Sequence, residues 1–117
     1  MNEPKAIIVD DEEEIGLMVC KILSKQNIKA TSFNTVESAR QQLSDNDFDL
    51  FFLDLNLPDG TGFDLIPAIR EKTPEAKIII ISAYDGIAEV ARATELQIDD
   101  FIKKPFSRAD IINAVQS

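Results

Sequence analysis

The chain has 117 residues and a formal net charge of −9, with 12 Lys and Arg against 21 Asp and Glu. A chain of this length forms one domain that buries roughly two thirds of its unfolded surface, and a hydrophobic content of 44% predicts a packed core. The acidic balance argues against nucleic-acid binding. The absence of histidine excludes serine–histidine catalysis, histidine metal ligands and a phosphohistidine carrier.

Signals for export or membrane insertion are missing from the sequence. The first residues do not form a signal-peptide pattern, and no apolar run approaches the ~18 residues of a transmembrane helix. The single cysteine, Cys20, cannot form an internal disulfide. We therefore expect a cytoplasmic protein that makes no membrane contact.

Strand-like and helix-like segments alternate five times along the chain. Short apolar runs predict strands, and each is followed by apolar residues at helical spacing. The strands are predicted at residues 6–9, 28–33, 50–53, 77–81 and 101–103, and the helices at 13–25, 34–43, 63–71, 87–96 and from 107 to the end. This alternation predicts an α/β fold with a parallel sheet, helices on both faces and right-handed crossovers.

Three helix boundaries carry local signals. Asn34 with Glu37 three residues later is typical of a capping box, and Ser107 with Asp110 repeats that spacing. Pro67 lies inside the third predicted helix, so it should kink that helix or delay its start.

Polar side chains follow four of the five predicted strands. Asp54 follows the fully apolar run 50–53, Asp10 and Asp11 follow the first strand, Ser82 the fourth and Lys104 the fifth. Open α/β sheets place ligands at the carboxyl ends of their strands, so we expect these side chains to meet at one edge. Taken singly, each has a simpler interpretation as a helix cap, a turn residue or a surface residue. Their joint placement favours a site.

The expected cluster of carboxylates needs a counterion. Two like charges ~4 Å apart repel by about 4 kcal/mol at an effective dielectric near 20, so either one carboxyl stays protonated or a cation sits among them. Hard oxygen ligands that leave room for water and phosphate suit Mg²⁺. Asp54 is then the candidate nucleophile for an acyl phosphate, and Ser82 and Lys104 are candidates for binding the phosphoryl oxygens.

Four segments of this chain strongly resemble the receiver domain of two-component response regulators. They are Val9-Asp10-Asp11-Glu12, residues 53–60, Ser82-Ala83 and residues 101–106. The resemblance extends over essentially all of residues 1–117 and implies a single receiver domain. It implies a flavodoxin-like, doubly wound sheet of five parallel strands in the order 2-1-3-4-5, with five helices. Whether the domain stands alone or was cut from a longer protein stays open.

The resemblance also implies a phosphoacceptor site. Asp54 would receive phosphate from a phosphohistidine on a sensor histidine kinase or a histidine phosphotransfer protein. Asp11 and Asp54 would ligate Mg²⁺, or alternatively Mn²⁺, directly, with Asp10 acting through water and Asn56 giving its backbone carbonyl. Ser82 and Lys104 would bind the phosphoryl oxygens. Such a domain is a signalling module and not an enzyme, beyond its own phosphorylation and dephosphorylation.

A conformational switch is implied by the same likeness. Phosphate draws Ser82 inward and an aromatic residue turns with it; here that residue is Phe101, which lacks the hydroxyl of the tyrosine often found there. The fourth helix, fifth strand and fifth helix would form the output face and a homodimer contact. The Lys104-Pro105 bond is expected to be cis.

Three further positions bear on this likeness. Gln97 replaces a glycine usual in the family, so we expect the fourth helix to end differently. Tyr84, two residues after Ser82, should slow water attack on the phosphoryl group, and Asn56 is a second position expected to modulate that lifetime.

The residues spaced around Asp54 argue against two other functions. In a phosphatase of the haloacid dehalogenase type, the nucleophile follows the first strand and has an aspartate two residues on, whereas here Asn56 follows Asp54. A calcium loop starting at Asp54 would need glycine and glutamate where Asp59 and Leu65 stand. A receiver-like binding module that works without phosphate remains open.

Overall fold

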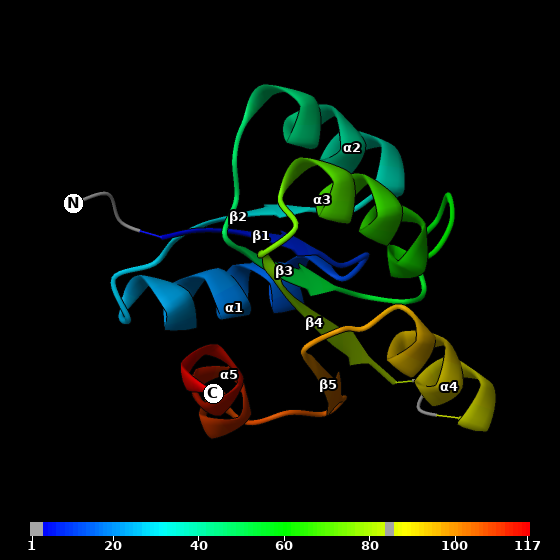
Figure 1. Ribbon diagram of the computed structural model, residues 1–117. Helices are drawn as coiled ribbons and strands as arrows, with labels where there is room; N and C mark the ends of the chain where they lie inside the picture. Colours follow the sequence, from blue (N-terminus) through cyan, green and yellow to red (C-terminus); the bar gives the residue numbers. More distant parts are fainter. Residues whose placement is uncertain (1–3, 84–85) are drawn as a thin grey trace.

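A five-stranded parallel sheet runs through the molecule, and helices pack on both of its faces (Figure 1). The structure is a computed structural model that describes residues 4–83 and 86–117. The strand order is β2-β1-β3-β4-β5, which confirms the flavodoxin-like topology. The elements are β1 (Lys5–Val9), α1 (Glu13–Ser24), β2 (Lys29–Phe33), α2 (Val36–Asp45), β3 (Leu50–Leu53), a 3₁₀ helix η1 (Gly62–Leu65), α3 (Ile66–Lys72), β4 (Lys77–Ser82), α4 (Ile87–Glu95), β5 (Asp100–Lys103) and α5 (Arg108–Gln116). Every helix within the described residues is too short or too polar to span a bilayer.

The central strand β3 is buried on both sides because alternate residues feed two separate cores. Phe51 and Leu53 pack in the core covered by α2 and α3, while Leu50 and Phe52 pack in the core covered by α1 and α5. Phe51 and Phe52 are 1% and 0% exposed. Burial of each such side chain contributes about 2–3 kcal/mol, so β3 is a rigid support for the residue that follows it.

The start of α2 corrects one sequence prediction. Thr35, not Asn34, is the N-cap: its backbone is extended and its Oγ1 accepts a hydrogen bond from Ser38 N at 3.1 Å. The next two amides donate to a distant side chain, since Val36 N and Glu37 N bond to the carboxylate of Asp59 at 2.8 and 3.0 Å. These bonds hold the start of α2 against the loop that follows β3.

The other boundary signals behave as predicted. Ser107 and Asp110 form a capping box at the start of α5. Pro67 lies in the first turn of α3, where its missing N–H costs nothing, and the preceding residues form the 3₁₀ turn η1. The proline therefore delays the helix.

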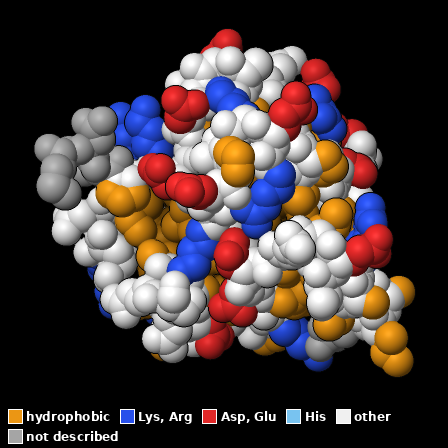
Figure 2. Space-filling view, in the orientation of Figure 1, with side chains coloured by type: hydrophobic (Ala, Val, Ile, Leu, Met, Phe, Trp, Pro, Cys, Tyr) orange, Lys and Arg blue, Asp and Glu red, His pale blue; other side chains and the backbone are white. Residues whose placement is uncertain are grey.

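Helix α4 is thinly packed. Ala93 is its one buried residue, whereas Ile87 is 92% and Val90 43% exposed. Figure 2 shows hydrophobic side chains at the corner of the molecule where α4 lies, beside mixed acidic and basic groups.

The end of α4 differs from the expectation set by Gln97. Gln97 adopts a φ of 58°, the left-handed conformation that glycine prefers, and so takes the place of a glycine. Gln97 N donates to Thr94 O and Ile98 N donates to Ala93 O, the pair of bonds that defines a Schellman motif. Arg70 Nη2 adds a bond to Gln97 O at 3.0 Å. The helix therefore closes in the standard way despite the missing glycine.

Candidate functional site

Asp54 lies at the carboxyl end of β3, as the sequence predicts, and its side chain is buried. The residue is 4% exposed. Its backbone is fixed on both sides, because Asp54 N donates to Val9 O at 2.8 Å and Asp54 O accepts from Gly62 N at 2.9 Å. A Cβ on Gly62 would stand 2.4 Å from Asp54 O, so only glycine allows this close approach.

Acidic residues following β1 lie beside Asp54. Asp10 is 2% exposed, and its Oδ1 accepts a hydrogen bond from Glu12 N at 2.9 Å. Asp11 and Glu12 are exposed. One carboxylate oxygen from each of these three residues lies within 4.8 Å of the others.

Lys104, which follows β5, contacts the acidic residues at the ends of both β1 and β3. Its ammonium Nζ lies 3.0 Å from Asp10 Oδ2, 3.2 Å from Asp54 Oδ2 and 3.3 Å from Glu12 Oε1, and the side chain is only 10% exposed. Its backbone is held by a bond from Lys104 N to Ser82 O at 2.9 Å. The Lys104-Pro105 peptide is cis, as expected. Lys104 is therefore part of the site and not a solvated surface residue.

The electrostatics of the site are set by burial and by the close carboxylates. Burial, followed by the charge of Asp10, raises the pKa of Asp54 from 3.8 to about 6. Burial likewise raises the pKa of Asp10. Burial opposes the charge on Lys104, but its hydrogen bonds and charge interactions with Asp10 and Asp54 outweigh that effect, so the pKa of Lys104 lies above its usual range.

The donor set fits a hard divalent cation. Asp10, Asp11, Glu12 and Asp54 offer four carboxylates against the single ammonium of Lys104. Such an excess of negative charge in a partly dry pocket calls for a cation, and oxygen ligands are those that Mg²⁺ prefers. Asp11 and Glu12 are exposed, which leaves that side of the site open to water.

Ser82 lies at the expected strand end, and Asn56 lies in the loop that follows β3. Ser82 is the last residue of β4 and is fully buried, and it pairs in register with Lys103 on β5. Asn56 is exposed, and its backbone N–H donates to Asp54 Oδ1 at 3.3 Å. This bond orients the Asp54 carboxylate from the loop side.

Phe101 and Tyr84 were the remaining predicted positions. Phe101 lies on β5 opposite Ile80 of β4, is half-buried and packs against the core under α2 and α3. Tyr84 lies outside the described residues. Glu12 was missed as a site residue, although its place directly after two aspartates at a strand end was the signal that could have found it.

The fold and site together define a flavodoxin-like α/β domain with an acidic pocket, a buried aspartate and a largely buried lysine side chain. The sequence model described as "Response regulator receiver domain" matches residues 6–116. The chain therefore belongs to the receiver domain family of two-component response regulators.

Individual relatives agree with this assignment. The chain is 34% identical to the response regulator protein PilR of Pseudomonas aeruginosa over 105 residues, which are 90% of this chain and 24% of PilR. It is 35% identical to the transcriptional regulatory protein CssR of Bacillus subtilis, covering 93% of this chain and 48% of CssR. This chain thus spans half or less of the length of these two relatives.

The solved structure of the non-phosphorylated HemR receiver domain from Leptospira biflexa is also similar. It is 32% identical, with a TM-score of 0.88, and the match covers 97% of this chain and 92% of that domain. Since nearly the whole of that receiver domain is matched, this similarity extends to the architecture around the acidic pocket.

Proposed function

We propose that this chain is a phosphoacceptor whose Asp54 takes a phosphoryl group from a phosphohistidine on a sensor histidine kinase or a histidine phosphotransfer protein. The observation that carries the proposal is the buried Asp54 carboxylate, which has the Lys104 ammonium 3.2 Å from Oδ2. The donor histidine lies outside these 117 residues because they contain none.

In the proposed reaction an Asp54 carboxylate oxygen attacks the phosphorus. The new O–P bond forms as the P–N bond to the donor imidazole breaks, and the electron pair of that bond stays on the imidazole nitrogen, which is then protonated. Attack requires the ionised carboxylate. With a pKa of about 6, Asp54 is about nine tenths ionised at pH 7.

Lys104 and Ser82 are proposed to bind the oxygens of the transferred phosphoryl group. Lys104 loses part of its contact with the carboxylate as a phosphoryl oxygen takes over one of its hydrogen bonds. Ser82 donates its hydroxyl to another phosphoryl oxygen. Both side chains are held by strand ends, so they need no large rearrangement before they bind the product.

The cation proposed for this site is Mg²⁺, with Mn²⁺ as an alternative. Asp10, Asp11 and Asp54 would hold it together with the backbone carbonyl of Asn56, and Glu12 adds a carboxylate within reach of the same cluster. When bound, the ion neutralises charge on the phosphoryl oxygens and lets them approach three carboxylates.

Output is proposed to follow from a population shift in which Ser82 and Phe101 rearrange once phosphate completes its contacts. The face formed by α4, β5 and α5 would carry the signal, by binding an effector or a second copy of the chain. The exposed Ile87 and Val90 on α4 support this choice of surface. We also propose that residues 1–117 form one receiver domain, and that Tyr84 and Asn56 modulate the phosphorylated lifetime.

Intact mass spectrometry tests the phosphoacceptor proposal. The wild type and the Asp54→Asn variant are incubated with Mg²⁺ and a small phosphodonor, and Asp47→Asn, at an exposed residue, is the matched control. We expect one added phosphate in the wild type and in the control, and none in Asp54→Asn. An unmodified wild type with every donor would instead favour a phosphate-independent binding module, and steady turnover of phosphate esters would favour a phosphatase.

A further inference from the structure

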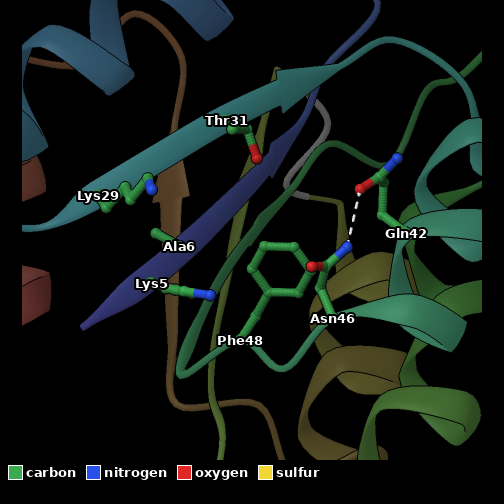
Figure 3. A pocket seen from close by; sticks show the side chains of 7 residues that line it. All are labelled: Lys5, Ala6, Lys29, Thr31, Gln42, Asn46 and Phe48. Carbon is green, nitrogen blue, oxygen red and sulfur yellow. Dashed lines mark hydrogen bonds between the residues drawn. The ribbon is translucent and has the colours of Figure 1, made fainter. Parts of the chain in front are cut away.

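A second cavity lies at the edge of the sheet opposite to the acidic pocket (Figure 3). It has a volume of about 150 Å³. It lies between the first residues of β1 and β2 and the last turns of α2, and it is lined by Lys5, Ala6, Lys29, Thr31, Gln42, Asn46 and Phe48. The length of β1, about 15 Å, separates it from Asp10, so it is distinct from the phosphoacceptor site.

The charged lining of this cavity is entirely basic. Lys5 and Lys29 are direct neighbours in the parallel register of β1 and β2, so their side chains leave the sheet on the same face. Among the described residues, no carboxylate forms an ion pair with either ammonium. Both lysines are exposed, so their ammonium groups are accessible to an anion from solution.

The two aspartates that flank Phe48 already have partners outside the cavity lining or on the backbone. Asp47 Oδ1 lies 3.6 Å from the ammonium of Lys72 on α3. Asp49 Oδ2 accepts a hydrogen bond from the backbone N–H of Lys5 at 2.9 Å. Neither of these two aspartates lines the cavity, so the cavity itself offers the two ammonium groups no carboxylate.

The remaining lining combines a rigid aromatic floor with polar walls. Phe48 is 7% exposed, and its ring packs edge-on against Phe51 with centroids 6.0 Å apart, which fixes its orientation. The amide of Asn46 is also fixed, because Nδ2 donates to Gln42 Oε1 at 3.2 Å. Figure 3 shows Lys5 extending toward the Phe48 ring, with Thr31 on the strand side and Asn46 on the helix side.

We propose that this cavity binds a small aromatic carboxylate. Its carboxylate would lie between the ammonium groups of Lys5 and Lys29, and its ring would pack on Phe48. A cavity of roughly 150 Å³ is the size that holds one benzene ring, so a single-ring acid fits and a nucleotide does not. The proposal does not depend on phosphorylation of Asp54.

The test is a titration of the ¹⁵N-labelled 117-residue chain with benzoate, followed by amide chemical shifts. We expect saturable shifts confined to the residues that line the cavity. The neutral analogue benzyl alcohol, which has the ring and no charge, should bind about tenfold more weakly or worse. The double variant Lys5→Gln/Lys29→Gln should lose binding to the same extent. The matched control Lys21→Gln/Lys25→Gln removes two exposed lysines at the end of α1 and should bind benzoate as the wild type does.

Several results would overturn the proposal. One is the absence of saturable shifts with benzoate, and another is equal weakening in the two double variants, which would indicate unspecific charge attraction. Inorganic phosphate serves as a second probe: tighter binding of phosphate than of benzoate would contradict a role for the aromatic floor. Thermal melts of both double variants serve as a control for folding. Transitions like that of the wild type show that a loss of binding arises from the change in the cavity and not from unfolding.

Discussion

Replacing Asp54 by asparagine should stabilise the metal-free protein. Burial and the nearby Asp10 raise the pKa of Asp54 from 3.8 to about 6. Above that pH the ionised carboxylate is therefore ~3 kcal/mol less stable in the folded protein than in the unfolded chain. The asparagine side chain has nearly the same shape and carries no charge. Because Lys104 loses one of its partners in the variant, we expect a measured gain of about 1–3 kcal/mol.

The sign of the effect gives it a distinctive pH dependence. A carboxyl with a raised pKa binds its proton more tightly in the folded state, so the wild type loses stability as the pH rises from about 4 to 6. The difference in free energy of unfolding between Asp54→Asn and the wild type should therefore be small near pH 4 and reach its full size at neutral pH.

Urea unfolding in EDTA, followed by far-ultraviolet circular dichroism, measures this difference. Glu75→Gln at an exposed turn removes the same charge without relieving a buried carboxylate, and it should leave the midpoint almost unchanged. The reasoning is refuted if Asp54→Asn unfolds at the same or a lower urea concentration than the wild type at neutral pH. It is also refuted if Glu75→Gln raises the free energy of unfolding as much as Asp54→Asn does.

Three other substitutions have defined outcomes. Lys104→Met leaves the carboxylates of Asp10 and Asp54 without their cation. In EDTA it should therefore lower the free energy of unfolding by about 3 kcal/mol at neutral pH and by less near pH 5. Urea titrations at the two pH values measure this difference. Gly62→Ala places a methyl group 2.4 Å from Asp54 O, and we expect a loss of about 2 kcal/mol in the same assay; an unchanged midpoint would contradict the close approach. Gln97→Gly relieves a left-handed residue, so differential scanning calorimetry should show a gain of about 0.5 kcal/mol, and a lower melting temperature would argue against it.

The sequence predicts the strand ends of this fold well because three buried apolar runs and a short fifth strand each end in a polar residue. That pattern places Asp10, Asp54, Ser82 and Lys104 at one edge, and the structure brings Asp10, Asp54 and Lys104 into contact. Parallel strands force such a meeting because their carboxyl ends share one edge of the sheet. Local sequence is therefore sufficient for the centre of the site.

Contacts between distant segments were not predictable in the same way. Thr35 is the cap of α2 and not Asn34, because Asp59, 23 residues away from Val36, already binds the first amides of the helix. Gln97 accepts a left-handed conformation because the Schellman bonds of α4 are made whichever residue stands there. At Thr35 a tertiary contact outweighs a local capping preference, and at Gln97 the bonds of the helix end, with the bond from Arg70, outweigh a local backbone preference of less than about 2 kcal/mol.

The single buried residue of α4 has a consequence for hydrogen exchange. Opening this helix exposes little more than Ala93, whereas its carboxyl end is tied to α3 through the bond between Arg70 and Gln97. The free energy of local opening is therefore lowest at the amino end of α4, near Ile87, and rises toward Glu95. The amides of this helix should exchange with solvent deuterium before those of β3, in a gradient that runs along the helix from its first turn to its last.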